Sequence, residues 1–354
     1  MEQILAANPV LQPPTFVSDW GLAMPRLLPL LACPADGSNL TWDSHDRAFI
    51  STNSRRYGFL DGIASFFVPN DGHEIQGDVT EIVKAFYETT PFPNYNDVDD
   101  RRALRQKAAA SAFAKLLDEQ LPRSAKVFEA GCGTGQLTNF LGMGPGRVCI
   151  GGDMCLNSLK LGSGFRDRFS INNAFFLQMN LFRPPLHDGM FDLVISNGVL
   201  HHTSDPEGGY RAILRKVRPG GIILIGLYNY FGRLHTLWRR RLIETFGKGV
   251  AILDARLRRL NGADEQYIAW YRDQYEHPHE SRHSIDEVLR WFESSDVDFI
   301  SCIPTIGDTE FSDQFELFEP HPRGSYLDRL STQWDMFLSG GGDGALFIMI
   351  GRKR

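Results

Sequence analysis

Residues 127–141 combine side chains and spacings that could hold a small ligand against the main chain. A short apolar run leads to the carboxylate of Glu129, and glycines follow at alternate positions, at Gly131, Gly133 and Gly135. Glycine lets the chain turn sharply and lets a ligand approach the backbone closely, and a helix is expected directly after the last glycine. A carboxylate at this place would repel a phosphate but attract an ammonium or sulfonium group. The loop therefore indicates a site for a positively charged ligand.

A second acid follows at the distance that nucleoside-binding α/β folds use. Asp153 ends the apolar run of residues 147–153 and stands 18 residues beyond Gly135. An acid about 20 residues after such a loop accepts hydrogen bonds from ribose hydroxyls. A third apolar run ends at Asn180, whose amide suits the edge of an adenine. S-adenosylmethionine (SAM) carries an adenosine and two cationic groups, and the glycine spacing departs from that of dinucleotide folds. The residues therefore favour SAM over NAD as the cofactor.

Five apolar runs, each followed by a helical pattern, predict the fold. The fourth and fifth runs are residues 191–198 and 222–228, and a tight turn at residues 218–221 precedes the fifth. Continuous apolar strands that alternate with helices predict a doubly wound α/β sheet with parallel strands. Ligands of such sheets bind at the carboxyl ends of the strands, where both acids are expected to lie.

Over residues 125–229 the chain resembles the class I SAM-dependent methyltransferases of the type 11/12 group. The resemblance rests on five motifs in order: the glycine loop, Asp153, Asn180-Leu181, residues 197–202 and the turn at 218–221. It implies methyl transfer from SAM on a seven-stranded Rossmann-like sheet with strand order 3-2-1-4-5-7-6. Asn180 departs from the pattern, since many relatives carry Asp there. The cofactor-binding residues that the resemblance implies are Glu129, Gly131, Gly133, Gly135, Asp153, Met154, Asn180, Leu181, Asn197 and Tyr87.

Residues 1–72 are expected to form a small β-rich module. Cys33 and Asp36 resemble one knuckle of the zinc ribbons that partner some methyltransferases, but Asp36 stands in place of a second cysteine and no second C-x-x-C follows. A structural zinc site is almost always completed by four ligands. We therefore expect a degenerate ribbon without metal, kept as a docking surface or as the contact of a homodimer.

Residues 73–124 link this module to a methyltransferase-like domain at residues 125–354. The apolar spacing at residues 80–88 predicts a helix, and the resemblance implies that an aromatic helix here closes over the cofactor. Tyr87 is the candidate on the cofactor side and Tyr95 the candidate for a substrate contact. Alternatively, both aromatic side chains only pack the linker against the domain.

Two insertions, residues 229–283 and 307–339, are expected to overhang the strand ends as a helical lid. Between residues 233 and 259 the chain has eight basic and two acidic residues, a local balance of +6 in a chain of net charge −6. Because such a patch attracts anions, we expect a small acidic acceptor with Arg233 among its contacts. The alternatives are a solvated helix face, an anionic membrane surface, and RNA, as in a tRNA methyltransferase. The net acidic charge and the lack of a recognisable RNA-binding module disfavour nucleic acid.

Histidines after the fourth strand are candidates for acid–base chemistry. Methyl transfer is an in-line displacement whose rate depends strongly on positioning, and a neutral oxygen or nitrogen acceptor must also lose a proton. Histidine titrates near neutrality, so we expect His202 to act as the base and His201 to pack or to contact the cofactor. Alternatively, both are structural. Tyr228 and Asn229, at the end of the fifth strand, could orient the acceptor.

The tract of residues 277–283 contains three histidines and a glutamate. Pro278 interrupts the helical face that an H-x-x-x-H metal site uses, so we expect a substrate loop, with His277 as a contact, and no metal. Two other functional classes stay open for the chain: a Rossmann dehydrogenase, and a non-catalytic subunit that binds a partner.

The composition fits a globular enzyme. The chain has 354 residues, of which 42% are apolar and 23% charged, as in soluble globular proteins. No apolar run approaches the ~20 residues that a membrane span needs. The first residues lack the basic flank of a secretory signal, and the five cysteines have no paired spacing. We expect a cytoplasmic protein with reduced thiols.

Overall fold

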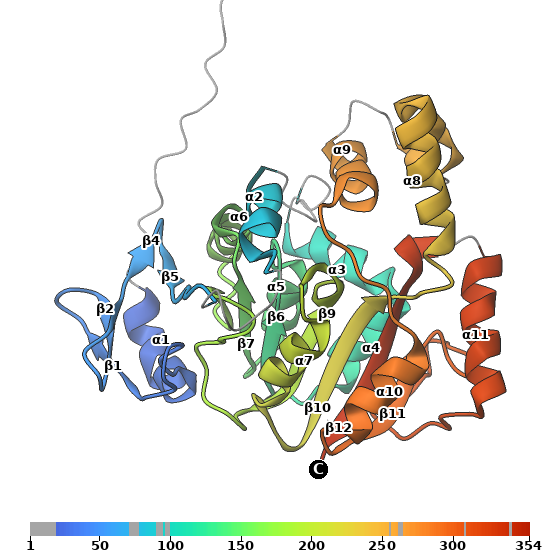
Figure 1. Ribbon diagram of the computed structural model, residues 1–354. Helices are drawn as coiled ribbons and strands as arrows, with labels where there is room; N and C mark the ends of the chain where they lie inside the picture. Colours follow the sequence, from blue (N-terminus) through green and yellow to red (C-terminus); the bar gives the residue numbers. More distant parts are fainter. Residues whose placement is uncertain are drawn as a thin grey trace, which may run out of the picture.

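The computed structural model of the protein describes residues 19–70, 78–89, 95, 100–254, 256–260, 265–307, 309–339 and 342–354 (Figure 1). The first 18 residues of the N-terminal module, and most of the linker between residues 71 and 99, lie outside this part of the chain.

A mixed sheet of nine strands forms the centre of the molecule, in the order β11-β12-β10-β9-β6-β7-β8-β5-β4. Its strands from β5 to β10 run parallel where they pair, whereas β12 is antiparallel to both β10 and β11. The bounds of the main strands are β6 Lys126–Ala130, β7 Val148–Asp153, β8 Ala174–Gln178, β9 Phe191–Asn197, β10 Val217–Tyr228, β11 Val297–Ile303 and β12 Leu346–Lys353.

The sheet is two strands wider than the seven expected. The additional strands are β4 (Phe59–Leu60) and β5 (Ile63–Ser65), a short hairpin of the N-terminal module. β5 pairs in parallel with β8, through Ala64 opposite Leu177 and Ser65 opposite Gln178. The hairpin thus covers the edge of β8, whose unpaired backbone groups would otherwise be open to pairing with another chain.

Helices cover both faces of the sheet because alternate strand residues point to opposite sides. Val127 lies in one apolar cluster and its neighbour Phe128 in the other. The cluster around Phe128 takes side chains from α1, α7 and α10, and the cluster around Val127 takes side chains from α3, α4, α5 and α6 (Figure 1). The bounds of these helices are α1 Asp19–Leu27, α3 Arg101–Ala109, α4 Ala112–Gln120, α5 Gln136–Gly142, α6 Leu156–Arg168, α7 Pro206–Leu214 and α10 Ile285–Glu293.

The N-terminal module shares its core with the sheet. Its own three-stranded sheet consists of β1 (Leu40–Asp43), β2 (Ala48–Ser51) and β3 (Arg56–Tyr57), beside α1 and the 3₁₀ helix η1 (Leu28–Leu30). Trp20 packs edge-on against Phe59 and against Phe175 of β8, with ring centroids 5.3 Å and 6.3 Å apart. Cys33 Sγ lies 3.1 Å from the hydroxyl of Tyr57, and no cluster suited to a metal ion occurs among the described residues. Docking or dimerisation through this module stays a prediction.

The insertion between β10 and α10 is helical. It consists of α8 (Leu234–Phe246), the 3₁₀ helices η3 (Lys248–Leu253) and η4 (Leu257–Arg259), α9 (Glu265–Tyr271) and the π-helix η5 (Arg272–Glu276). A small apolar cluster that includes Trp270 and Tyr275 holds it together. The remaining elements are α2 Thr80–Thr89, η2 Leu200–His202, α11 Tyr326–Leu338 and η6 Gly342–Ala345. None of the described helices is long and apolar enough to cross a membrane.

We predict that Phe66→Ala destabilises the whole protein and not the N-terminal module alone. Phe66 is fully buried, between Phe49 and Tyr57, in the core that the module shares with the sheet. Removing a buried phenylalanine ring costs about 3–5 kcal/mol of unfolding free energy. Denaturant unfolding, followed by circular dichroism and tryptophan fluorescence, should show one transition at a lower denaturant concentration.

The matched control is Leu22→Ala, because Leu22 lies on α1 with its side chain 83% exposed, and its effect should stay within about 0.5 kcal/mol. An early transition confined to the N-terminal module, with the main transition unmoved, would contradict a shared core.

Candidate active site

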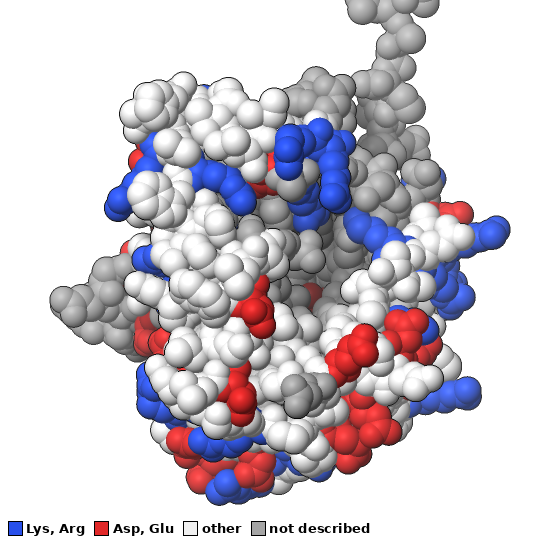
Figure 2. Space-filling view, turned by 90° about the vertical axis from the view of Figure 1, so that its right-hand side faces the viewer, with Lys and Arg blue, Asp and Glu red and all other residues white. Residues whose placement is uncertain are grey.

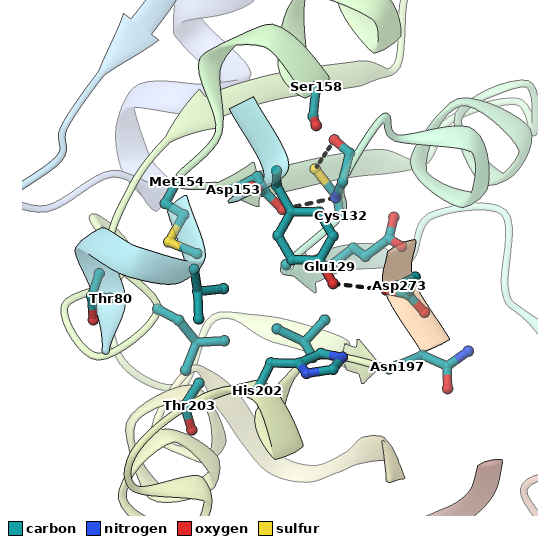
Figure 3. Close-up of a pocket in the computed structure, with 18 of the residues that line it drawn as sticks. Thr80, Glu129, Cys132, Asp153, Met154, Ser158, Asn197, His202, Thr203 and Asp273 are labelled. Carbon is teal, nitrogen blue, oxygen red and sulfur yellow. Dashed lines mark hydrogen bonds between the residues drawn. The ribbon is translucent and has the colours of Figure 1, made fainter. Parts of the chain in front are cut away.

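A cavity of about 400 Å³ opens at the carboxyl ends of the parallel strands (Figure 3). The ends of β6, β7, β9 and β10 form its floor, α2 covers one side, and the end of the helical insertion contributes Trp270, Asp273 and Gln274. This is the place where open α/β sheets bind their ligands.

The glycine loop brings the main chain to the cavity wall. β6 ends at Ala130 and α5 begins at Gln136, and all three intervening glycines have positive φ, a conformation that glycine adopts without steric cost. Gly131 and Gly133 line the cavity. Gly135 does not, because it lies against the ring of Phe176, where an added Cβ would come within 2.2 Å. Its role in cofactor binding is therefore corrected to one in the turn.

Two buried carboxylates lie beside this loop. Glu129 lines the cavity and accepts a hydrogen bond from Thr138, yet burial raises the pKa of Glu129 to about 7. Asp153 accepts hydrogen bonds from the backbone N–H groups of Gly133 and Cys155, both at 2.8 Å. Burial also raises the pKa of Asp153, although these N–H groups oppose the shift. Both carboxylates are positioned to stabilise a cationic or hydroxyl-bearing ligand.

Four other expected cofactor residues line the same cavity: Met154, Asn180, Leu181 and Asn197. Asn180 is held by its own hydrogen bonds, because its amide donates to the Val68 carbonyl at 3.0 Å and to Asn70 Oδ1 at 2.7 Å. Asn197 Oδ1 is buried and has no hydrogen-bond partner among the described residues. This oxygen lies against Gly226 of β10, where an added Cβ would come within 1.8 Å of it.

Tyr87 reaches the cavity from α2. Its hydroxyl donates to Asp273 Oδ1 at 3.0 Å, and burial raises the pKa of this phenol well above its ordinary value (Figure 3). α2 is fixed to the sheet side by Glu88, which accepts a hydrogen bond from the backbone N–H of Leu156 at the start of α6. Tyr87 therefore connects the helix before the domain with the insertion after β10.

His201 and His202 form a closed chain of hydrogen bonds. His201 Nδ1 accepts from the backbone N–H of Tyr228 at 3.3 Å, so the proton of its neutral ring is on Nε2. That nitrogen lies 3.1 Å from His202 Nε2, and His202 Nδ1 lies 3.0 Å from the carbonyl oxygen of His279. A neutral His202 thus accepts from His201 and donates to His279. Burial lowers the pKa of His202 to about 3 and that of His201 well below its usual value.

This arrangement corrects the expected role of His202. Its ring lines the cavity, but both ring nitrogens are occupied by neighbours, so no lone pair is left to take a proton from an acceptor. His201 does not line the cavity; it stacks on Tyr228, with ring centroids 3.8 Å apart.

The four expected substrate contacts lie outside the cavity wall. Tyr95 lies behind the glycine loop, where its hydroxyl donates to the Thr134 carbonyl at 3.0 Å. Asn229 is fully buried and binds Gln333 and the turn at Phe231. His277 packs behind His202, with ring centroids 3.7 Å apart. These residues support the walls and do not touch a ligand in the cavity.

Arg233 is the clearest correction. Its side chain is 0% exposed and forms a two-pronged ion pair with Glu280, with N–O distances of 2.7 Å and 2.5 Å. Its guanidinium also lies 3.9 Å from the ring centroid of Tyr228. The remaining basic residues of the insertion lie on its surface or bind neighbours, as Arg239 binds Asp254 and Arg240 binds Glu244. Figure 2 shows basic side chains gathered over the upper part of this side of the molecule, where α8 lies. None of the described basic residues of the insertion thus lines the cavity, although Arg256 stacks on the lining residue Trp270 at 3.9 Å from its ring centroid.

Asp273 and Gln274 are cavity residues that the sequence patterns did not indicate. They lie on the π-helix η5, and short π-helical segments occur often at functional sites. No motif surrounds them, and the sequence indicated a substrate contact in the histidine tract that begins three residues after Gln274. Similarly, no described residue of the insertion 307–339 lines the cavity, so only the first insertion lies over it.

Comparison with known proteins agrees with this geometry. Residues 128–225 match the model of a family described as methyltransferase domain. An uncharacterised protein of Synechococcus is 29% identical over 254 residues, which make up 63% of this chain and 60% of that protein. Chloroplastic tocopherol O-methyltransferase of Arabidopsis thaliana is 29% identical over 169 residues, 46% of this chain and 48% of that protein. The chain therefore spans between about half and 60% of the length of these relatives.

A solved structure of magnesium protoporphyrin IX methyltransferase from Synechocystis, with bound SAM, aligns with 78% of this chain and 98% of its own, at 13% identity and a TM-score of 0.44. The family match and the curated relatives identify residues 128–225 as a methyltransferase domain, and SAM is the cofactor of this domain.

We predict that SAM binding weakens as the pH falls through 7. The pKa of Glu129 is raised to about 7 in the free protein, and a cationic ligand favours the ionised carboxylate. Below pH 7 binding must therefore displace a proton, and the affinity should fall about tenfold between pH 8 and pH 6. Isothermal titration calorimetry at the two pH values, in buffers of different ionisation enthalpy, measures both the affinity and the released proton.

Glu129→Gln is the matched control, because the amide keeps the shape but does not titrate. This variant should bind SAM more weakly at pH 8 and with less change towards pH 6. If wild type and variant show the same pH dependence, Glu129 does not contact the cofactor.

Proposed function

We propose that this protein transfers the methyl group of SAM to an oxygen or nitrogen atom of a small molecule. The observation that supports it most directly is one cavity whose wall carries both the glycine loop with its two acids and a separate polar pair, Asp273 and Gln274, from the insertion. The first set suits the cofactor and the second suits an acceptor.

The residues of the first set fit SAM. Gly131 and Gly133 present backbone without side chains, while Glu129 and Asp153 offer carboxylates to the cation and to ribose hydroxyls. Leu181 and Asn180 would face the adenine, and Met154 lies beside Asp153 (Figure 3). SAM supplies an electrophilic methyl group on a positively charged sulfur.

The rest of the chain positions the acceptor and excludes water. Val83 and Tyr87 of α2 and Trp270 of the insertion close the cavity over the strand ends. Holding the two reactants in line in such an enclosure converts a bimolecular reaction into one that is effectively unimolecular. His202 contributes as a rigid part of the wall, fixed by His201 and His279.

The proposed acceptor is not an anion, in contrast to the expectation from the sequence, because no Lys or Arg occurs among the described residues that line the cavity. A small molecule still fits better than a tRNA nucleotide, since the described lining residues offer no cation to a phosphate. The relative from Arabidopsis thaliana is named for methylation of tocopherol, a small molecule, which supports this choice. A non-catalytic SAM-binding subunit is the second candidate, and retention of SAM without any transfer would favour it.

A methyl-transfer screen with labelled SAM tests the proposal. The purified chain is incubated with phenols, amines, small acids and bulk tRNA, and the label in each product is measured. We expect transfer to at least one small-molecule class and none to tRNA. Labelled tRNA, or a protein that binds SAM but labels no small molecule, would contradict the proposal.

We predict that His202→Gln keeps turnover with the best acceptor of that screen within a fewfold of wild type. Glutamine can still accept one hydrogen bond and donate another, whereas loss of a general base typically lowers kcat by about 10²–10⁴. The pH profile of kcat/KM should also keep its shape. His202→Leu, which breaks both hydrogen bonds of the wall, is the structural comparison, and a loss of a hundredfold or more in His202→Gln would restore His202 as the base.

A further inference from the structure

Among the described residues that line the cavity, Asp273 is the one acid that does not come from a strand end. It enters from the π-helix η5, and its side chain is buried, at 6% exposure (Figure 3). Tyr87 donates to its Oδ1 at 3.0 Å, and Tyr228 lies 3.4 Å from its Oδ2. The amide of Gln274 donates to the same Oδ2 at 2.9 Å. A carboxylate has about four acceptor positions, so these three donors leave room for one more.

The partners of Asp273 separate it from the cofactor end of the cavity. Its two phenols belong to α2 and to the end of β10, whereas Asp153 is held by the glycine loop and the start of α6. His202, which follows β9, packs edge-on against the same two tyrosines, with ring centroids 6.4 Å and 5.7 Å away. Asp273 thus lies over the ends of β9 and β10.

The charge of the cavity argues against a negatively charged ligand beside Asp273. Glu129, Asp153 and Asp273 line it, and the described lining residues include no Lys or Arg. The nearby cation, Arg233, is fully buried and neutralised by Glu280, with the ring of Tyr228 over its guanidinium. SAM brings positive charge to the cofactor end only. A ligand near Asp273 must therefore be a hydrogen-bond donor.

Apolar side chains also form part of the wall, and they define the body of that ligand. Val199, Trp270 and Leu346 line the cavity together with Val83 of α2. Burial of apolar surface against such side chains is favourable at about 25 cal/mol per Å², whereas a strongly hydrated amine or sugar would lose its water without replacement.

We propose that Asp273 is the acceptor-binding carboxylate of the cavity, and that the acceptor is an apolar molecule that presents a phenolic hydroxyl to it. This assignment rests on the proposed methyl transfer. In the step, an oxygen lone pair of the acceptor forms the new O–C bond while the S–C bond breaks and leaves its electron pair on sulfur. The O–H electron pair stays on the acceptor oxygen, and the proton passes to Asp273. The products are an aryl methyl ether, S-adenosylhomocysteine and a protonated Asp273.

Tyr87 and Tyr228 keep the carboxylate ready for this proton. Burial raises the pKa of both phenols above their ordinary value, so they remain neutral donors. Arg233, over the ring of Tyr228 and bound to Gln274, fixes the orientation of this group. Tyr228 is then a positioning residue and not the acceptor's base.

Three probes that share one butylphenyl body test the class of acceptor: 4-butylphenol, 4-butylanisole and 4-butylbenzoate. Each is titrated calorimetrically into the full-length protein saturated with S-adenosylhomocysteine. The phenol should bind about tenfold or more tightly than the ether, which lacks the donor, and than the benzoate, which is an anion. In Asp273→Asn the preference for phenol over benzoate should disappear. Benzoate binding as tight as that of the phenol, or no binding of the phenol, overturns the proposal.

Turnover provides the second measurement. With labelled SAM and 4-butylphenol, Asp273→Asn should lower kcat by about 10²–10⁴, with the SAM affinity unchanged. The control is Glu276→Gln, on the same π-helix but paired with Lys248 and Arg272 at the surface, and it should behave as wild type.

If Asp273→Asn weakens SAM binding and leaves the phenol preference intact, Asp273 belongs to the cofactor site and the assignment is wrong. SAM binding is measured first on wild type. If the wild-type protein does not bind SAM, the proposed function itself is wrong. If it binds SAM but shows no preference for the phenol, only the acceptor assignment is wrong.

Discussion

The structure depends on the burial of carboxylates at the carboxyl edge of the sheet. An ionised group removed from water is costly unless hydrogen bonds or opposite charges compensate it. Asp153 is compensated by the backbone N–H groups of residues 133, 154 and 155, Glu129 by the hydroxyl and backbone N–H of Thr138, and Asp273 by two phenols and an amide. The least compensated of these acids is Glu129, whose pKa burial raises to about 7. A cationic ligand supplies the opposite charge that the protein does not provide for Glu129.

The need to compensate buried charge also explains how the helical insertion is held beside the cavity. Arg233 begins α8 from a fully buried position, and it must pair there because an unpaired buried guanidinium is strongly destabilising. Glu280 supplies the pair from the far end of the insertion, 47 residues later. Gln274 accepts from Arg233 as well, and Gln274 adjoins Asp273. Arg233, which the sequence analysis expected to attract a substrate, thus fixes the segment that carries Asp273, the carboxylate proposed to bind the acceptor.

The elements that the sequence predicts well are those set by local patterns. The apolar runs around Glu129 and Asp153, and the glycine turn between strand and helix, depend on neighbours within a few residues. The additional strand β5 depends on pairing of Ala64 with Leu177, more than a hundred residues away. Asp273 likewise becomes a cavity residue only through Tyr87 and Tyr228, so no local pattern could reveal it. The basic run of the insertion was misleading because charge counts do not tell a buried arginine from an exposed one.

The placement of acids at both ends of the cavity also matches the change of charge in the proposed reaction. Transfer removes the positive charge from sulfur, which would leave the buried carboxylates with one counterion fewer in a medium of low polarity. When the acceptor's proton moves to Asp273, one negative charge disappears in the same step. One buried positive charge and one buried negative charge are thus lost together, and no new buried ion is formed. A histidine base would instead become a buried cation while the sulfonium is lost. The hydrogen bonds that hold His202 neutral, and its pKa of about 3, oppose that outcome. The loss of two buried ions without the formation of a new one is therefore a physical reason to place the proton on a carboxylate.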